Sequence, residues 1–246
     1  MNDLLTALMS RRSVRAYRDD PVQPDVPDRI LEAMRRAPTA GNQTQYSVIE
    51  VEDPGARKTL ALTCDNQPFI ASAPWVLVFL ADVQRLLDYY SHSGVTPKPP
   101  REGDALLATA DAFVAAQTAV IAAEAEGLGS CYIGDILEHY ETVRDLLNLP
   151  RYVLPVSLIT FGYPTEQQRH RPQPGRMERS SFVFRDRYHR LRGDDLAHVY
   201  DYADPGPDRY RSGADTFGQH MHDRKYASDF MNELRRSVAV MFSYWR

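Results

Sequence analysis

The feature that most constrains the fold is an alanine-rich segment, residues 104–126, in which small apolar side chains recur at helical spacing. Alanine has the highest helix propensity and lets neighbouring elements approach closely. The pattern therefore predicts one long buried helix against which the other elements pack. The most apolar stretch, 106–128, contains Asp111, Glu124 and Glu126. Because these charges are too many for a bilayer span, we expect the core helix of a soluble protein.

Apolar runs predict a sheet beside this helix. The runs at 75–80 and 153–161 are continuously apolar, which is typical of central strands covered on both faces. Shorter runs at 46–51 and 130–133 would complete the sheet. Helical patterns occur at residues 3–9, 25–37, 54–62, 85–90, 140–147 and 215–245.

The chain of 246 residues, 43% of them apolar, is long enough for one large domain or two small ones. We expect residues 1–190 to form the functional core, with a mobile, proline-rich excursion at 91–103 that could cover a site. Residues 191–246 are charged and aromatic and have too little apolar surface to fold alone. This extension is expected to wrap the core or a second subunit.

The overall charge excludes some partners. A formal net charge of −4 gives no indication of nucleic-acid or anionic-membrane binding, so any anion must be bound by a local cluster. Cys64 and Cys131 lack disulfide or zinc spacing, and no cleavable signal precedes the first helix, so we expect a cytoplasmic protein. His220 and His222 stand two residues apart and point to different helix faces, so no metal site is expected.

A cluster of arginines follows the first predicted helix. Arg11, Arg12 and Arg15 stand beside Ser13 in a run of five residues. Each guanidinium can offer two parallel charge-assisted hydrogen bonds, so the cluster suits a phosphate dianion. The alternative is a solvated helix end, where the helix dipole favours positive charge.

Two loops are further candidates. The loop before the first strand has small side chains at Thr39, Ala40 and Gly41, which would let its backbone amides approach a planar ligand, and Gln45 could bond the edge of a flat heterocycle. An ordinary helix-to-strand turn would have the same composition. The basic loop 165–179 follows a central strand, where ligand sites gather, although such a loop can also be simply solvated.

Five motifs in order resemble the nitroreductase superfamily, most closely its NADPH-preferring branch of flavin reductases and oxygen-insensitive nitroreductases. The motifs are RRSVRAY, APTAGNQTQYSV, DNQPFIASAPWVLVF, AEAEGLGSCYIGDI and LPVSLITFGYP. The resemblance extends from Leu5 to about Met231. It implies a three-layer α+β fold in which helices wrap a central mixed, mostly antiparallel sheet. It also implies an intertwined homodimer with FMN at the subunit interface.

The same resemblance implies individual site residues. The FMN-binding residues of one subunit would be Arg11, Arg12, Ser13, Arg15, Gln67, Tyr132, Ile133, Gly134 and Asp135. The partner subunit would supply Thr39, Ala40, Gly41 and Gln45. Arg171 matches a family lysine that contacts the phosphate. Two positions depart from the pattern: Gln173 replaces a second basic residue, and Asp135 replaces a common glycine or glutamate beside flavin N5.

The implied activity is a ping-pong oxidoreduction. NADPH, or alternatively NADH, would reduce FMN, and a nitroaromatic, a quinone or free flavin would then take two electrons without a catalytic side chain. Arg209 and Arg211 lie in the region where this branch grips the 2′-phosphate of NADPH. The alternatives are a dehalogenase-like reductive enzyme on the same fold and a non-catalytic flavin carrier or sensor.

Overall fold

The computed structural model describes residues 3–211 and 213–246, and the chain divides into two compact units. The first unit comprises Met1–His170 with Asn232–Arg246, and the second comprises Arg171–Met231. The C-terminal fifteen residues thus pack with the N-terminal part of the chain. The expected limit of the cofactor-binding core at residue 190 stays a prediction.

A four-stranded sheet forms the centre of the first unit, in the order β1-β2-β4-β3. The strands are β1 (Tyr46–Glu50), β2 (Trp75–Asp82), β3 (Gly129–Ile133) and β4 (Val153–Gly162). All three neighbouring pairs are antiparallel, and a parallel bridge joins Ser13 to Ser130. Every residue of β2 and β4 is buried, which confirms the expectation that the two continuously apolar strands are central.

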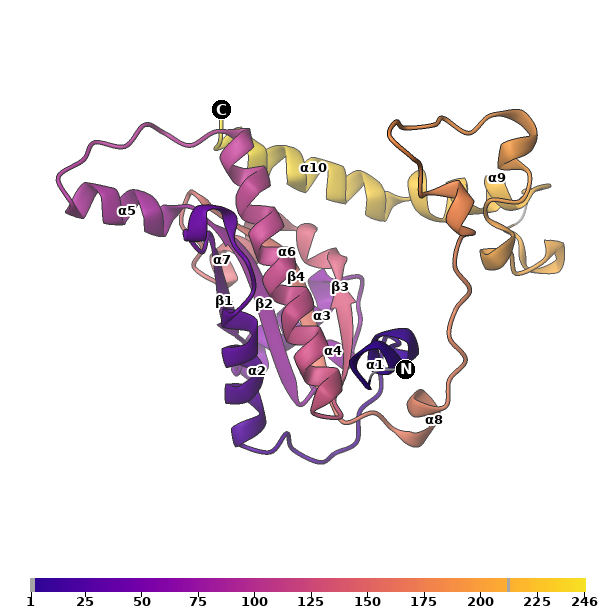
Figure 1. Ribbon diagram of the computed structural model, residues 1–246, viewed down its shortest axis with the longest axis horizontal. Coiled ribbons are helices and arrows are strands. Elements are labelled where there is room, and N and C mark those ends of the chain that lie inside the picture. Colours follow the sequence, from indigo (N-terminus) through magenta and orange to yellow (C-terminus); the bar gives the residue numbers. More distant parts are fainter. Residues whose placement is uncertain (1–2, 212) are drawn as a thin grey trace. The chain divides into compact units, whose positions relative to one another are not determined.

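Helices cover both faces of the sheet. On one face, α6 (Glu102–Ala125) crosses the strands with α2 (Asp25–Arg35) beside it (Figure 1). On the other face lie α3 (Pro54–Thr63), α4 (Phe69–Ser72) and α7 (Tyr140–Leu146). The remaining helices of this unit are α1 (Asp3–Ser10), α5 (Gln84–His92), α8 (Glu166–Arg169) and most of α10 (Asp229–Ser243). Two hydrophobic cores result, one on each face, so the three-layer α+β fold is confirmed.

The alanine-rich helix is the core helix that its sequence predicts. By length and composition α6 could cross a membrane, but its buried side chains, among them Ala112, Ala116 and Val120, pack in the core with α2 and the sheet. Both cysteines are also buried, Cys64 and Cys131 being 0% and 1% exposed. Burial raises the pKa of both thiols, that of Cys64 to about 12.

The second unit consists of short turns and helices. The prediction of one long helix over 215–245 is wrong, because the segment contains α9 (Phe217–Met221), a π-helical turn (His222–Tyr226) and then α10. The break falls at Ala227 and Ser228. The Ser228 hydroxyl accepts a hydrogen bond from the Met231 backbone N–H (3.3 Å), so it caps the new helix.

An ion-pair network attaches α10 to α7 within the first unit. The Arg236 guanidinium donates to both carboxylate oxygens of Glu141 and of Glu233, all at 2.8 Å. Glu233 also accepts hydrogen bonds from the His139 N–H (3.0 Å) and the Ser237 hydroxyl (2.8 Å). These charge-assisted bonds lower the pKa of Glu141 and Glu233 from an ordinary 4.5 to about 2.

Replacing Arg236 with methionine should lower the free energy of unfolding at pH 7, because the change removes the charge-assisted hydrogen bonds to Glu141 and Glu233. Because both carboxyl pKa values are lower in the folded state, the network's contribution is complete above about pH 4.5 and is lost as the pH falls towards 2. Urea unfolding at pH 7, 4 and 2.5 measures this, with Arg235→Met as the matched control. A pH-independent difference between Arg236→Met and the parent would contradict the assignment.

Candidate active site

A slot between two glycines holds the arginine segment against the sheet. Gly129 of β3 is paired directly with Gly162 of β4. A Cβ atom on Gly129 would lie 2.4 Å from Cγ2 of Val14, and one on Gly162 would lie 2.8 Å from Cδ1 of Tyr17. Side chains at either position would occupy the space of the N-terminal segment, so the glycine pair makes this close approach feasible.

Hydrogen bonds fix the segment along the sheet edge. The Val14 backbone N–H donates to the Ser130 carbonyl (2.9 Å). The Tyr17 hydroxyl lies 2.7 Å from the Thr160 hydroxyl and donates to the Val14 carbonyl at 2.8 Å. Val14 is 3% exposed, and burial raises the pKa of the Tyr17 phenol. Val14 is a buried anchor and Tyr17 a half-buried one. Arg15 and Ala16 between them are exposed, and residues 11–13 before them are half-buried.

A cavity of about 250 Å³ lies beside the arginine segment. Arg12 lines it, and its guanidinium donates to the Ser10 carbonyl (3.2 Å) and to the carbonyl of Arg169. The Arg15 backbone N–H donates to the side-chain oxygen of Gln168 (3.2 Å). Arg12 is therefore fixed by carbonyl groups from two segments, which orients a charged donor towards a concave surface.

Strand β3 lies in the electrostatic field of Arg11 and Arg15. Burial raises the pKa of the Tyr132 phenol to about 12, and the positive charge of Arg11 opposes this rise. Arg15 likewise opposes the rise in the pKa of the Cys131 thiol. The structure thus brings Arg11 and Arg15 close to β3, as the predicted site requires.

Glu124 is a residue of this cavity that the sequence interpretation missed. It projects from the end of α6 into the cavity that Arg12 lines. Burial raises the pKa of this carboxyl group, whereas the charges of Arg11 and Arg12 lower it. The sequence indicates this role only by a carboxylate near the end of an alanine-rich core helix, a feature that also argues against a membrane span.

Gln67 and Asp135 meet at the other end of β3. Ile133, the last residue of the strand, is buried, and Gly134 and Asp135 begin a short 3₁₀ turn. The Gln67 side-chain amide donates to Asp135 Oδ2 at 2.7 Å. At Gly134 no atom lies within 4 Å of the position that a Cβ would take, so the turn faces open space. Gln67 and the predicted residues 132–135 are therefore assembled in one chain.

The loop that contains Thr39, Ala40 and Gly41 is organised by a buried carboxylate. Asp111 of α6 accepts hydrogen bonds from the backbone N–H groups of Ala40 (2.9 Å) and Gln45 (3.3 Å). Gly41 has a φ of +58°, which glycine adopts without strain. The Gln45 side chain is 5% exposed and donates to Gln43, so it supports the loop from within. Asp111 is the first of the charged residues that interrupt the apolar stretch 106–128.

This loop lies at the opposite end of the sheet from the arginine segment. It leads into Tyr46, which pairs with Ala81 at one end of β2, whereas Trp75 at the other end pairs with Phe161 beside the glycine slot. From Trp75 to Ala81 there are six residue steps, or about 20 Å along the strand. The two predicted halves of the site therefore do not meet within one chain.

The donor set fits a phosphorylated flavin. Ser130 is fully buried next to the arginine segment, and its hydroxyl has no hydrogen-bond partner among the described residues. Guanidinium groups stand at one end of β3, and an amide and open backbone stand at the other. An elongated ligand with an anionic end and a flat polar end would match this order of groups along the strand.

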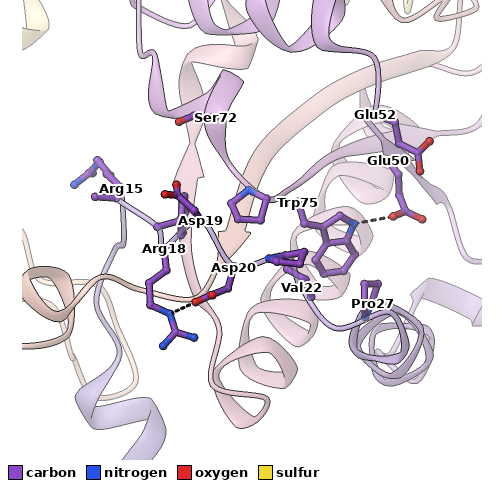
Figure 2. Close-up of a pocket in the computed structure, with 14 residues that line it drawn as sticks. Arg15, Arg18, Asp19, Asp20, Val22, Pro27, Glu50, Glu52, Ser72 and Trp75 are labelled. Atoms are coloured by element: carbon purple, nitrogen blue, oxygen red, sulfur yellow. Dashed lines mark hydrogen bonds and ion pairs between the residues drawn. The ribbon is translucent and has the colours of Figure 1, made fainter.

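A neighbouring cavity of about 510 Å³ has a different character. Figure 2 shows Arg18 paired with Asp20 (2.8 Å) and the Trp75 indole N–H donating to Glu50 (2.7 Å). Arg15 is its one residue from the predicted FMN set. Its lining contains four acidic residues and two arginines, so its net negative charge does not suit a phosphate.

The remaining predicted residues belong to the second unit. Arg171 and Gln173 stand at its beginning, and Arg209 ends a 3₁₀ turn, Pro207–Arg209. The Arg211 backbone N–H donates to Nδ1 of His220 (2.9 Å). Their roles towards phosphate and NADPH stay predictions.

Comparisons with known proteins show the family and the fold of the chain. The Nitroreductase family model matches residues 8–163. An FMN reductase (NAD(P)H) of Bacillus subtilis is 34% identical over 70% of both chains. An FMN reductase (NADPH) of the same species is 28% identical over 81% of this chain and 79% of its own. The structure of the hypothetical oxidoreductase YcnD from B. subtilis has a TM-score of 0.81 and 26% identity over 98% of both chains.

Replacing Gly129 with alanine should displace the arginine segment, because its Cβ would overlap Val14. We expect a loss of about 1–3 kcal/mol in the free energy of unfolding, as for an overpacked core. Combining it with Val14→Ala should recover part of the loss, since the nearest methyl group is removed; urea unfolding of the two single variants and the double variant measures the coupling. Strictly additive effects would show that the two residues are not in contact.

Proposed function

This chain belongs to the nitroreductase family, and we propose that it is an FMN-dependent NAD(P)H oxidoreductase. The observation that carries the proposal is the order of groups along β3. The backbone of Val14 is bonded to Ser130 at the beginning of the strand, and Gln67 is bonded to Asp135 just beyond its end. The arginine segment that would bind the anion and the amide that would bond a flat ring thus lie at the two ends of one strand.

Within one subunit, Arg11, Arg12, Ser13 and Arg15 would hold the FMN phosphate and ribityl chain, and Arg171 would add a contact to the phosphate. Gln67, with residues 132–135, would line the ring. Charge-assisted bonds from guanidinium to phosphate are the strongest in this set. Gln173 stands where the family pattern has a basic residue, so phosphate binding depends more heavily on the N-terminal arginines.

A homodimer would complete the site. The 39–45 loop lies about 20 Å along the sheet from the glycine slot, so Thr39, Ala40, Gly41 and Gln45 would reach FMN from the partner subunit. The core helix also exposes apolar side chains that a monomer would leave in water. Leu106 is 70% exposed and Phe113 is 45% exposed. Burial of these side chains between subunits would stabilise the dimer.

Bound FMN would supply the redox chemistry, accepting a hydride from the nicotinamide and passing two electrons to a second substrate. The chain's own residues would bind and orient the cofactor and set the local charge. Open space at Gly134 would admit a flat acceptor to the ring, so nitroaromatics, quinones and free flavin are the proposed acceptors. A ping-pong order follows, because donor and acceptor would occupy the same surface in turn. We also propose a cytoplasmic location.

Replacing Arg12 with alanine should yield largely colourless protein. The change removes one or two charge-assisted bonds to phosphate, worth about 1.5–3 kcal/mol each, so FMN affinity should fall at least about tenfold. Flavin absorbance of the purified protein and titration with FMN measure the loss. Arg18→Ala is the matched control, since Arg18 pairs with Asp20 and lies over the Tyr163 ring. Full flavin content in Arg12→Ala would refute the phosphate assignment.

The activity itself is tested by adding NADPH to the yellow protein without oxygen. Rapid bleaching is expected of a reductase, whereas persistent colour would indicate a carrier or sensor and overturn the proposal.

The coenzyme preference can be tested separately. Replacing Arg209 and Arg211 together with alanine should raise KM for NADPH about tenfold or more and leave KM for NADH nearly unchanged, because only NADPH carries the 2′-phosphate. Steady-state kinetics with both donors give the two ratios. Equal changes for both donors would show that these arginines do not recognise the 2′-phosphate.

A further inference from the structure

The orientation of the Gln67 side chain is fixed by two hydrogen-bond acceptors. Its Nε2 atom lies 2.9 Å from the carbonyl oxygen of Cys64 and 2.7 Å from Oδ2 of Asp135. Both of these atoms are acceptors, and Asp135 bonds as a carboxylate. An amide oxygen in this place would meet two oxygens without a hydrogen. The NH₂ group must therefore occupy the position, and the amide oxygen points away from both partners.

We propose that Asp135 is a positioning residue that presents the Gln67 amide oxygen, as an acceptor, to a ligand edge carrying an N–H donor. The inference rests on the proposed function, in which that ligand is FMN. The flavin pyrimidine edge has one N–H, at N3, between two carbonyl oxygens. With its NH₂ group already engaged, Gln67 would accept from N3–H.

The position of Asp135 favours an influence on the ring as well as on Gln67. Asp135 follows Gly134, whose surroundings are open, so this turn is accessible to a planar ligand. The carboxylate is partly buried. Its negative charge contributes to the raised pKa of the Cys64 thiol, so its field reaches neighbouring groups through the protein. A reduced flavin, which gains negative charge, would be disfavoured beside it.

Two substitutions separate position from charge. Asp135→Asn keeps an oxygen acceptor for Gln67 and removes the negative charge, and the Cys64 carbonyl still favours the same amide orientation. Asp135→Ala removes both the acceptor and the charge. Asp28→Asn, on the exposed side of α2, is the matched control for a change of net charge.

The first measurement compares the dissociation constants of FMN and N3-methyl-FMN, which lacks the N3 donor. The ratio of the dissociation constant of N3-methyl-FMN to that of FMN should be the same in the parent, Asp28→Asn and Asp135→Asn. In Asp135→Ala it should fall about two- to tenfold, as expected for one hydrogen bond that is no longer held in place. The steric effect of the methyl group is common to all four proteins and cancels in this comparison.

The second measurement is the two-electron midpoint potential of the bound FMN. Both Asp135 variants should bind reduced FMN more tightly, relative to oxidised FMN, by about tenfold, which is about 30 mV for a two-electron couple. Asp28→Asn should leave the potential unchanged. Neither measurement depends on turnover. A role of Asp135 in folding alone would not change the N3-methyl ratio in Asp135→Ala and leave it unchanged in Asp135→Asn.

The outcomes distinguish a failure of the proposed function from a failure of the positioning role of Asp135. If the parent protein binds no FMN, the proposed function is overturned and this inference with it. If FMN binds but the N3-methyl ratio is the same in Asp135→Ala as in the parent, the positioning role of Asp135 is refuted while the proposed function stands. An unchanged potential in both Asp135 variants would refute its placement beside the ring in the same way.

Discussion

The close approach of the N-terminal segment to the sheet edge is the contact on which the proposed site depends. It is feasible because Gly129 and Gly162 face each other across β3 and β4 and leave room for Val14 and Tyr17. Burial of Val14 and the hydrogen bonds of the half-buried Tyr17 fix a segment that would otherwise be a charged loop. The guanidinium groups beside them are then held near β3, where Glu124 supplies an opposite charge to Arg11 and Arg12. Packing and backbone hydrogen bonds position the segment, and its excess of positive charge over Glu124 suits an anion.

Helix α6 links the two ends of the proposed site. Asp111 organises the 39–45 loop, and Glu124 reaches the cavity beside Arg12. These two residues are thirteen positions apart, which is about 20 Å of helix and matches the separation estimated along β2. One rigid element thus sets the distance between two half-sites that face different cofactors in the proposed dimer. Its alanines allow this by letting the helix lie close to the sheet.

The fold was largely predictable, because continuous apolar runs and alanine spacing report burial directly. The central strands at 75–80 and 153–161 and the core helix follow from these patterns with small shifts of their ends. The break near Ser228 was missed, because polar helical periodicity continues across it and a single capping hydroxyl decides the outcome. Within the site, motif order indicated the arginines and Gln67. The roles of Asp111 and Glu124 were missed, because the partners of these carboxylates come from segments distant in sequence. Asp111 accepts hydrogen bonds from the 39–45 loop, and Glu124 lies near Arg11 and Arg12.

The burial of the two thiols affects how the protein responds to oxidation. Cys64 and Cys131 are inaccessible and their pKa values are raised, so little thiolate forms near neutral pH. A protein that handles reduced flavin in air would be exposed to peroxide formed at its own cofactor. Sulfenic acid formation requires an accessible thiolate, so neither cysteine is a ready target. The two cysteines should therefore resist oxidation by this by-product.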